Sequence, residues 1–260
     1  MIKVNSKDNT PIGVYKYGTG PALLLVHGSR QDHKHWFRVL PHLENHFTVY
    51  TMDRRGRGGS GDAESYHMER EFEDVAAVAQ WIAEPLYLFG HSYGGICSLE
   101  ACLRINNLRK LILYEPPIQA GVMIQDPGVA DEIQAQVDAG DLEGATATFY
   151  LRILRRTDTE IEKIRTGPSW QQFLRTVHIL PRELHGVDNY RYDAARFSHL
   201  DVPKLFLLGE LSPDYFGKVT RVLHGDLKNS RISVMPGQHH AAMDTGPELL
   251  AREIIDFLQE

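Results

Sequence analysis

Short apolar runs alternate with longer amphipathic stretches over the first 115 residues. We predict strands at the apolar or alternating runs 13–18, 22–28, 47–53, 85–90 and 109–114. Helical periodicity lies between these runs, at 33–45, 69–82 and 94–105. The first helix contains Pro41, which should kink or stop it. Strands separated by helices predict right-handed crossovers and a mostly parallel sheet.

The pattern changes after Pro116 and Pro117. Residues 118–200 contain no strand pattern, but helical stretches occur at 129–140, 142–156 and 170–180. Alternation then resumes, with strands at 203–210 and 231–237 and helices at 216–227 and 247–260. The chain therefore predicts an α/β fold with a mostly parallel twisted sheet and helices on both faces. Its core should comprise residues 1–117 and 201–260, interrupted by an all-helical insertion at 118–200.

Composition narrows the class of protein. A chain of 260 residues fits one large α/β domain, and its net charge of −6 comes without any basic run. This argues against nucleic acid or an anionic membrane as the main partner. The amino-terminal residues lack an apolar segment of signal-peptide length, and Cys97 and Cys102 would lie on different faces of one helix. We expect two free thiols in a soluble cytoplasmic protein that acts on a small molecule.

A nucleophile motif stands between a predicted strand and a predicted helix. The residues Gly90-His91-Ser92-Tyr93-Gly94 form the pattern G-x-S-x-G. A serine on so tight a turn needs very small residues two positions before and two after it, because larger side chains would collide. The turn should lift the Ser92 hydroxyl clear of the sheet and set the Tyr93 N–H at the positive end of the helix.

At this point the chain resembles the α/β-hydrolase family. The resemblance rests on "LLLVHG", "MDRRGRGGSG" and "GHSYGG", on the helical insertion as a cap, and on the carboxy-terminal loop and helix. It implies that an oxyanion hole is formed by the backbone N–H groups of Ser29, which follows His-Gly, and of Tyr93.

A serine nucleophile needs a general base, for which histidine is suited at neutral pH. Family members are similar to this chain in carrying a histidine seven residues before the proline that opens the last helix. Counting back from Pro247 gives His240, with His239 as the alternative.

The base in turn needs an orienting carboxylate. The position that the family usually supplies, after the strand at 203–210, holds Ser212, which carries no charge. Three carboxylates could replace it, namely Glu115, Asp214 and Glu210. We favour Glu115, because it ends a buried strand next to that of Ser92, and a buried acid needs a partner such as His240. Haloalkane dehalogenases are similar in carrying a glutamate at that strand end.

Two other patterns point to different chemistry. Gly56, Gly58 and Gly61 match the dinucleotide-binding spacing, but no helix opens inside the motif, and the resemblance implies a structural turn braced by Asp53 and its arginines. His33 and His35 have a spacing that can ligate metal, but no cysteines or further clustered carboxylates accompany them beyond Asp32. We expect neither a metal nor an organic cofactor.

Large side chains in the insertion suggest an apolar pocket. Candidate substrate-binding residues are Trp36, Met123, Phe149, Trp170 and His178. The expected function is hydrolysis of a small hydrophobic carboxylic ester, a lactone or a thioester through Ser92, His240 and an acid. A carbon–carbon bond hydrolase with the same triad is one alternative. A ligand-binding protein on the same scaffold is another, supported by the missing acid at position 212.

Overall fold

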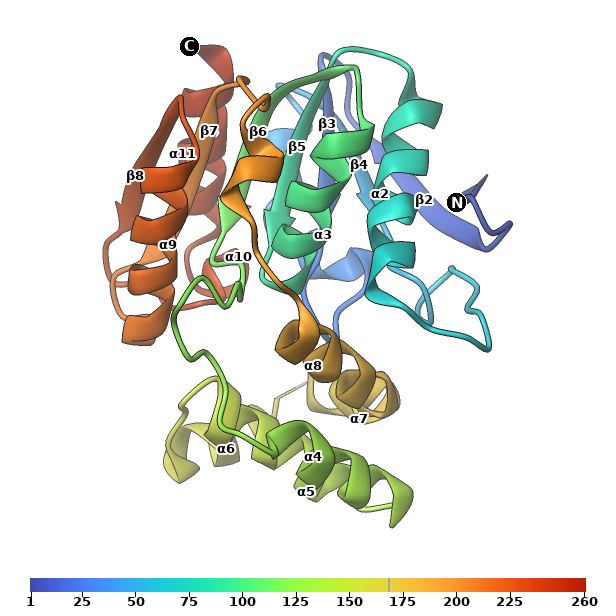
Figure 1. Ribbon diagram of the computed structural model, residues 1–260, viewed down its shortest axis with the longest axis vertical. Helices are drawn as coiled ribbons and strands as arrows, with labels where there is room; N and C mark the ends of the chain where they lie inside the picture. The colour runs from blue at the N-terminus through green and yellow to red at the C-terminus, as the bar shows by residue number, and fades with distance from the viewer. Residues whose placement is uncertain (168) are drawn as a thin grey trace.

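A twisted sheet forms the centre of the protein (Figure 1). The computed structural model describes residues 1–167 and 169–260. The strands of the described chain are β1 (Ile2–Asn5), β2 (Pro11–Tyr17), β3 (Ala22–Val26), β4 (Thr48–Met52), β5 (Leu86–His91), β6 (Leu108–Tyr114), β7 (Lys204–Gly209) and β8 (Ser230–Met235). Their order is β1-β2-β4-β3-β5-β6-β7-β8, with β2 antiparallel to both neighbours and the other pairs parallel. The predicted α/β class with a mostly parallel sheet is confirmed.

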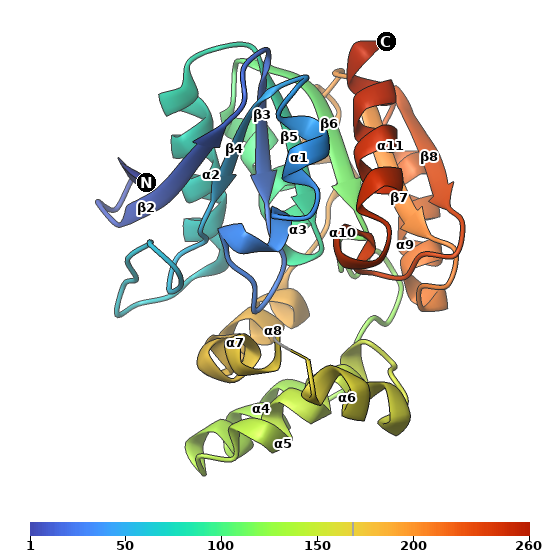
Figure 2. The ribbon, with the colours of Figure 1, turned by 180° about the vertical axis from the view of Figure 1, so that it is seen from behind.

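Helices cover both faces of this sheet, as Figures 1 and 2 show from opposite sides. The helices on the two faces and at their loops are α1 (Leu40–Leu43), α2 (Met68–Ile82), α3 (Tyr93–Ala101), α9 (Asp214–Asp226), α10 (Ala242–Thr245) and α11 (Pro247–Gln259). Leu24 of β3 packs in one cluster with α2, α3 and α9, whereas its neighbour Leu23 packs in another with α1 and α11. Successive side chains of a strand point to opposite faces, which is why this strand is apolar throughout.

The insertion between β6 and β7 forms helices at the end of the sheet where the parallel strands terminate (Figure 1). They are α4 (Val129–Asp138), α5 (Leu142–Thr148), the π-helical turn η3 (Phe149–Ile153), α6 (Asp158–Arg165), α7 (Ser169–Thr176), η4 (Val177–Ile179), α8 (Leu180–Asn189) and η5 (Ala194–Phe197). These helices have apolar clusters of their own, one around Val177 and one around Trp170. The described residues of 118–200 contain no strand.

Several element boundaries differ from the prediction. Strand β1 was not predicted; it is short and pairs only at the sheet edge. The helix expected at 33–45 is divided into a 3-10 turn, η1 (His33–Trp36), and α1, with Pro41 in the first turn of α1, where a missing N–H costs nothing. The helix expected at 94–105 continues after α3 as a second 3-10 turn, η2 (Cys102–Arg104).

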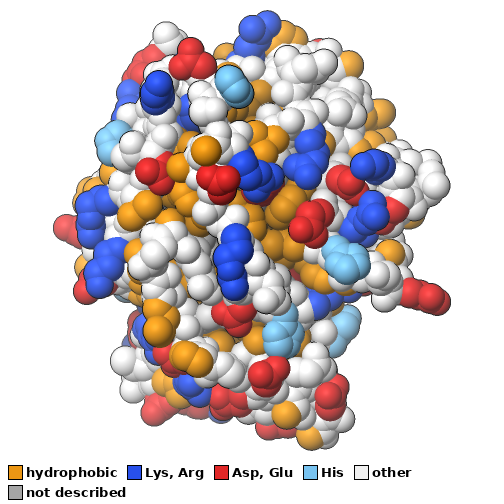
Figure 3. All heavy atoms as spheres, in the orientation of Figure 1, with side chains coloured by type: hydrophobic (Ala, Val, Ile, Leu, Met, Phe, Trp, Pro, Cys, Tyr) orange, Lys and Arg blue, Asp and Glu red, His pale blue; other side chains and the backbone are white. Residues whose placement is uncertain are grey.

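The cysteines, the charged surface and the helix lengths can also be compared with what the sequence predicts. Cys97 and Cys102 are both buried and free, as predicted. Basic and acidic side chains are interspersed over the face seen in Figure 3. None of the helices in the described part of the chain is long and apolar enough to cross a membrane.

Candidate active site

Ser92 lies on a strained turn between β5 and α3. Its φ is +53°, a value that side-chain-bearing residues rarely adopt. A methyl group at Gly90 would come closer than 3.0 Å to Ser98 Oγ and to the Gly94 carbonyl oxygen. One at Gly94 would come equally close to the carbonyl oxygens of Val26 and His27. The steric requirement expected for the motif is therefore present at both glycines.

Gly94→Ala should damage both stability and the site. The added methyl group would meet backbone carbonyls that cannot rotate away, so we expect the free energy of unfolding to fall by about 3 kcal/mol. The matched control is Gly225→Ala in α9, where nothing lies within 4 Å of the new methyl group. Removing a helical glycine there should raise the free energy of unfolding by about 0.5 kcal/mol. Urea unfolding followed by circular dichroism measures the free energy of unfolding of both variants. The same change in Gly94→Ala and Gly225→Ala would contradict the steric argument.

The turn after β3 lies directly against Ser92. A methyl group at Gly28 would approach Ser92 Cβ to 2.9 Å, so only glycine allows this proximity. His27 Nδ1 donates to the Gly28 carbonyl at 2.8 Å, and its Nε2 accepts the Arg54 N–H at 3.1 Å. Burial lowers the pKa of His27 well below its usual value, which keeps it in this neutral tautomer. Ser29 and Tyr93, the two predicted oxyanion-hole residues, line one cavity together with Ser92.

His240 is paired with Glu115. The Nδ1 atom of His240 lies 2.5 Å from Glu115 Oε2, and Glu115 Oε1 accepts the Gly209 N–H at 2.7 Å. Glu115 is fully buried and follows β6 with a φ of +48°. Both of its oxygens thus have partners, which offsets the cost of burying a carboxylate.

Neighbouring side chains fix the position of this imidazole. His91 Nε2 donates to the His240 carbonyl at 2.8 Å, and burial, with His240 nearby, holds the pKa of His91 well below its usual range. The Phe216 ring stacks on the His240 ring at 4.4 Å between centroids. The contact of His91 with the His240 loop was not predicted, because the two residues are 149 positions apart in the sequence.

The other candidate acids and the other histidine lie elsewhere. Asp214 is exposed at the start of α9, and Glu210 accepts the Gly237 N–H at 2.7 Å. His239 Nδ1 faces the Leu211 carbonyl. Among the described residues, Glu115 is the acid that contacts His240.

Ser92 and His240 line a cavity that is small and mostly apolar. Its volume is about 30 Å³, and Phe149, Ile153 and Phe216 are among its walls. This leaves room for little more than a water molecule. No hydrogen bond joins Ser92 Oγ to His240 among the described residues; catalytic hydrogen bonds often tighten only when substrate is bound.

Of the predicted substrate-binding residues, Phe149 lies at this cavity and the other four do not. Trp36 packs edge-on against Phe89, on the face of the sheet that α1 and α11 cover. Met123 is 71% exposed, and His178 is exposed on η4. The Trp170 indole N–H donates to Glu143, so its ring packs inside the insertion. These four residues do not line the cavity, because aromatic content alone does not say which way a helix faces.

A buried ion network joins the insertion to the core beside Tyr93. Glu183 of α8 accepts from Arg54 and Arg57, at 2.6 Å in each case, and Arg54 also pairs with Glu71. The Arg54 guanidinium lies 4.3 Å from the Tyr93 ring centroid. This network was not predicted, since its members are up to 129 positions apart. The network holds both helix α8, through Glu183, and the Tyr93 ring against the Arg54 guanidinium.

Glu183→Gln should destabilise the protein in a pH-dependent way. Burial would raise the pKa of Glu183, but Arg54 and Arg57 outweigh it and lower the pKa to about 2. The ionised pair therefore contributes stability above the unfolded-state pKa, near 4.5, and loses it as pH falls toward 2. We expect the variant to lose about 3 kcal/mol at pH 7, and the difference from wild type to shrink below about pH 4. Urea unfolding across pH measures this; a difference that grows on acidification would contradict it.

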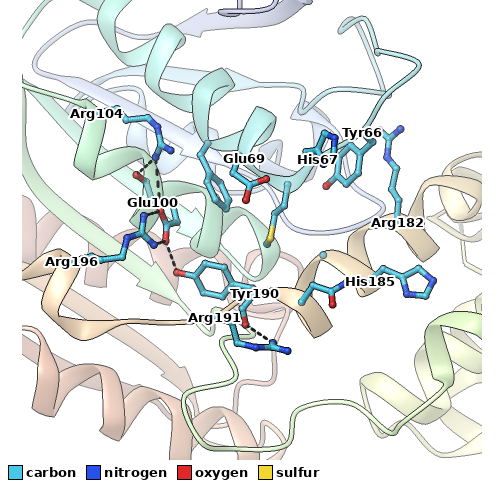
Figure 4. A pocket seen from close by; sticks show the side chains of 14 residues that line it. Tyr66, His67, Glu69, Glu100, Arg104, Arg182, His185, Tyr190, Arg191 and Arg196 are labelled. Carbon is cyan, nitrogen blue, oxygen red and sulfur yellow. Dashed lines mark hydrogen bonds and ion pairs between the residues drawn. The ribbon is translucent and has the colours of Figure 1, made fainter.

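A larger hollow lies between α2, α3 and α8 (Figure 4). Its volume is about 630 Å³, and it does not include Ser92. Arg104 and Arg196 both converge on the buried Glu100 there, and Tyr190 donates to the same carboxylate. Glu100 and these two arginines therefore neutralise one another, whereas Ser92 and His240 lie at the smaller cavity.

The turn after β4 is braced by Asp53. This buried carboxylate accepts the backbone N–H groups of His33 at 2.7 Å and of Gly59 at 2.6 Å, and it contacts the His33 ring at 2.8 Å. Asp32, His33 and Asp53 are close enough together to hold a metal ion. However, Asp53 is already engaged by these donors, and a methyl group at Gly58 would collide with it. The structural role expected for this glycine-rich turn fits these contacts.

Two hydrolases are similar to this chain in sequence. The chain is 28% identical over 181 residues to an uncharacterized hydrolase, YraK, of Bacillus subtilis, an alignment covering 68% of this chain and 65% of that protein. It is 29% identical over 145 residues to a pimeloyl-[acyl-carrier protein] methyl ester esterase of Aeromonas hydrophila, covering 53% of this chain and 56% of that protein. The chain thus spans less than two thirds of the length of either relative.

A solved structure matches over nearly the whole length. The crystal structure of an alpha/beta hydrolase from Sphaerobacter thermophilus is 28% identical, covers 99% of this chain and 100% of its own, and has a TM-score of 0.88. Residues 23–253 match the family described as the alpha/beta hydrolase family. With a strained serine turn, a paired histidine and this extent of match, the chain belongs to the alpha/beta hydrolase family.

Proposed function

We propose that this protein is a serine hydrolase that cleaves a small carboxylic ester, lactone or thioester through Ser92, His240 and Glu115. The observation that carries the proposal is the buried contact of 2.5 Å between His240 Nδ1 and Glu115 Oε2, on an imidazole that lines the same cavity as Ser92. Glu115 holds the proton on Nδ1, which leaves Nε2 free to act as the base.

The proposed reaction has two halves. Ser92 Oγ attacks the ester carbonyl carbon while His240 Nε2 takes its proton, and the N–H groups of Ser29 and Tyr93 stabilise the oxyanion. His240 then gives the proton to the leaving alcohol, and an acyl-enzyme remains on Ser92. A water molecule, deprotonated by His240, attacks the acyl carbon; the bond to Ser92 Oγ then breaks, His240 returns the proton to Ser92 Oγ, and the carboxylic acid is released.

In this proposal the helices at 118–200 act as a cap over Ser92. Phe149, Ile153, Leu184 and Val187 come from these helices and form apolar walls of the cavity. An apolar acyl or alcohol group fits such a lining. Because the cavity volume is only about 30 Å³, substrate entry requires these helices or their side chains to move.

Two further points favour an esterase. The Aeromonas relative is a methyl ester esterase by name, which is consistent with ester chemistry at this site. The idea of a non-catalytic binding protein depended on the missing acid at Ser212, and the contact of Glu115 with His240 supports Glu115 as the acid instead. The expected cytoplasmic location stays a prediction.

The proposal is tested by combining a probe with a substrate. A fluorophosphonate should add covalently to the peptide that contains Ser92, and p-nitrophenyl acetate should be hydrolysed. Labelling is read by mass spectrometry and turnover by release of p-nitrophenolate. A protein that is neither labelled at Ser92 nor active on any short ester would refute the proposal.

A further inference from the structure

Arg30 is a buried cation next to the proposed oxyanion hole. It follows Ser29 directly, has a φ of +61°, and is only 4% exposed. Its backbone carbonyl accepts the Thr176 hydroxyl of α7 at 3.0 Å. The turn that carries Ser29 is therefore attached to the insertion through Arg30.

The Arg30 guanidinium is surrounded by aromatic rings of the insertion. Its central carbon lies 4.1 Å from the Phe149 ring centroid, 4.3 Å from that of Phe173 and 4.7 Å from that of Tyr150. Cation–π contacts of this kind offset part of the cost of burying the charge. They use the ring faces and leave the N–H groups without acceptors.

Arg30 also has no counter-ion among the described residues. Its Nε and Nη1 atoms are buried and donate no hydrogen bond. The fully buried Arg54 and Arg55 differ sharply, because each forms short ion pairs with carboxylates. A buried guanidinium with free donors is costly unless an anion pairs with it.

Phe149 connects this cation to the reactive cavity. Its side chain lines the cavity of Ser92 and His240 and also contacts the Arg30 guanidinium. Two polar side chains that the insertion and α9 place at the cavity are already used, because Gln125 donates to the Leu184 carbonyl and Tyr215 to the Ile153 carbonyl. Arg30 is thus the nearby group with unused donors and an uncompensated charge.

We propose that Arg30 binds a carboxylate of the substrate, so that the ester cleaved at Ser92 belongs to a carboxylate-bearing molecule such as the half-ester of a dicarboxylic acid. This inference rests on the proposed esterase function. The planar guanidinium can donate two parallel hydrogen bonds to a carboxylate, which Lys cannot. Once the helices that wall the cavity move to admit substrate, its apolar lining can pack against the carbon chain between the ester and the carboxylate, and the aromatic rings exclude water from the ion pair.

The test compares matched esters. In the first series, the methyl half-esters of succinic, glutaric and adipic acids are each paired with a neutral methyl ester in which an isopropyl group replaces the free carboxylate. In the second series, the carboxylate is on the alcohol part of the ester, and each compound is again paired with its neutral analogue. In the wild-type protein, kcat/KM for the half-ester of one chain length should exceed that of its neutral partner by about 100-fold. This ratio should fall to about 1 in Arg30→Met. In Arg30→Lys it should lie between the wild-type ratio and that of Arg30→Met.

Thr176→Val is the matched control, because it removes the hydrogen bond to the Arg30 backbone but keeps the guanidinium. Its ratio should equal that of wild type even if its turnover is lower. Equal or faster cleavage of the neutral esters throughout both series by the wild-type protein would overturn the inference. So would a ratio that survives in Arg30→Met.

Binding to the inactive Ser92→Ala protein separates this inference from the esterase proposal. Titration calorimetry with succinate, glutarate and adipate should show saturable binding that Arg30→Met in the same background weakens at least about 10-fold. If the fluorophosphonate labels Ser92 but no dicarboxylate binds and no half-ester is preferred, the subsite is refuted and the esterase stands. If Ser92 is inert but a dicarboxylate binds through Arg30, the esterase fails and the anion site stands.

Discussion

Ser92→Ala should lower kcat for ester hydrolysis by about 10⁶-fold, the loss measured when the serine of a comparable triad is removed. The reason is that no other side chain can replace the Ser92 hydroxyl. The strained turn holds Ser92 at a φ of +53°, and Ser92 lines the same cavity as His240. The residual rate should come from oxyanion stabilisation and binding alone. Steady-state turnover of p-nitrophenyl butyrate, with active sites counted by fluorophosphonate titration, measures the loss.

The matched control is Ser198→Ala, which removes a hydroxyl from an exposed position. It should leave both kcat and probe labelling unchanged. The Ser92→Ala protein should also unfold at close to the wild-type denaturant concentration, because the exchange removes one oxygen from a partly exposed site. A Ser92→Ala protein that keeps more than about one hundredth of the wild-type turnover would mean that another group is the nucleophile.

The features that could be predicted from the sequence are those in which local pattern and sheet topology act together. The apolar run at 22–28 and the strand–helix alternation around it predicted a mostly parallel sheet, and the strands from β3 to β8 pair in parallel in the structure. Gly90 and Gly94 in the pattern predicted the tight turn. At Gly90 the crowding comes from the nearby Ser98 and Gly94, whereas at Gly94 it comes from the carbonyl oxygens of Val26 and His27, which are distant in the sequence. Glu115 was favoured as the partner of His240 because it ends a buried strand next to that of Ser92. In the structure β5 and β6 are adjacent, and the Glu115 oxygens contact both Gly209 and His240.

What could not be predicted depends on contacts between distant segments. Trp36 and Trp170 looked suitable for a pocket, yet they pack on other faces, and a helical pattern does not say which neighbour an aromatic side chain will meet. The pairing of Glu183 with Arg54 and the aromatic surroundings of Arg30 depend on how the insertion docks. Helix α6 could have been found from its first turn, since Thr157 and Glu160 form a capping box.

Glu115→Gln should lower kcat by roughly 10³–10⁴-fold, by analogy with other triads in which the acid is changed to its amide. The surrounding contacts dictate how the amide must lie. Its oxygen must face the Gly209 N–H, since an amide nitrogen there would set two donors against each other. The amide N–H₂ then points at His240 Nδ1, which can accept only in the other tautomer. That tautomer places the proton on Nε2, where the base must be empty to take the proton from Ser92.

Asp214→Asn is the matched control, because it makes the same chemical change at an exposed acid that does not touch His240. It should alter kcat by less than about twofold, as expected for a surface position without a specific contact. The tautomer argument also predicts a partial recovery of Glu115→Gln at high pH, if deprotonated solvent species can replace the blocked base. The opposite ranking, with Asp214→Asn the more damaging change, would remove Glu115 from the mechanism and leave its contact with His240 as a structural one.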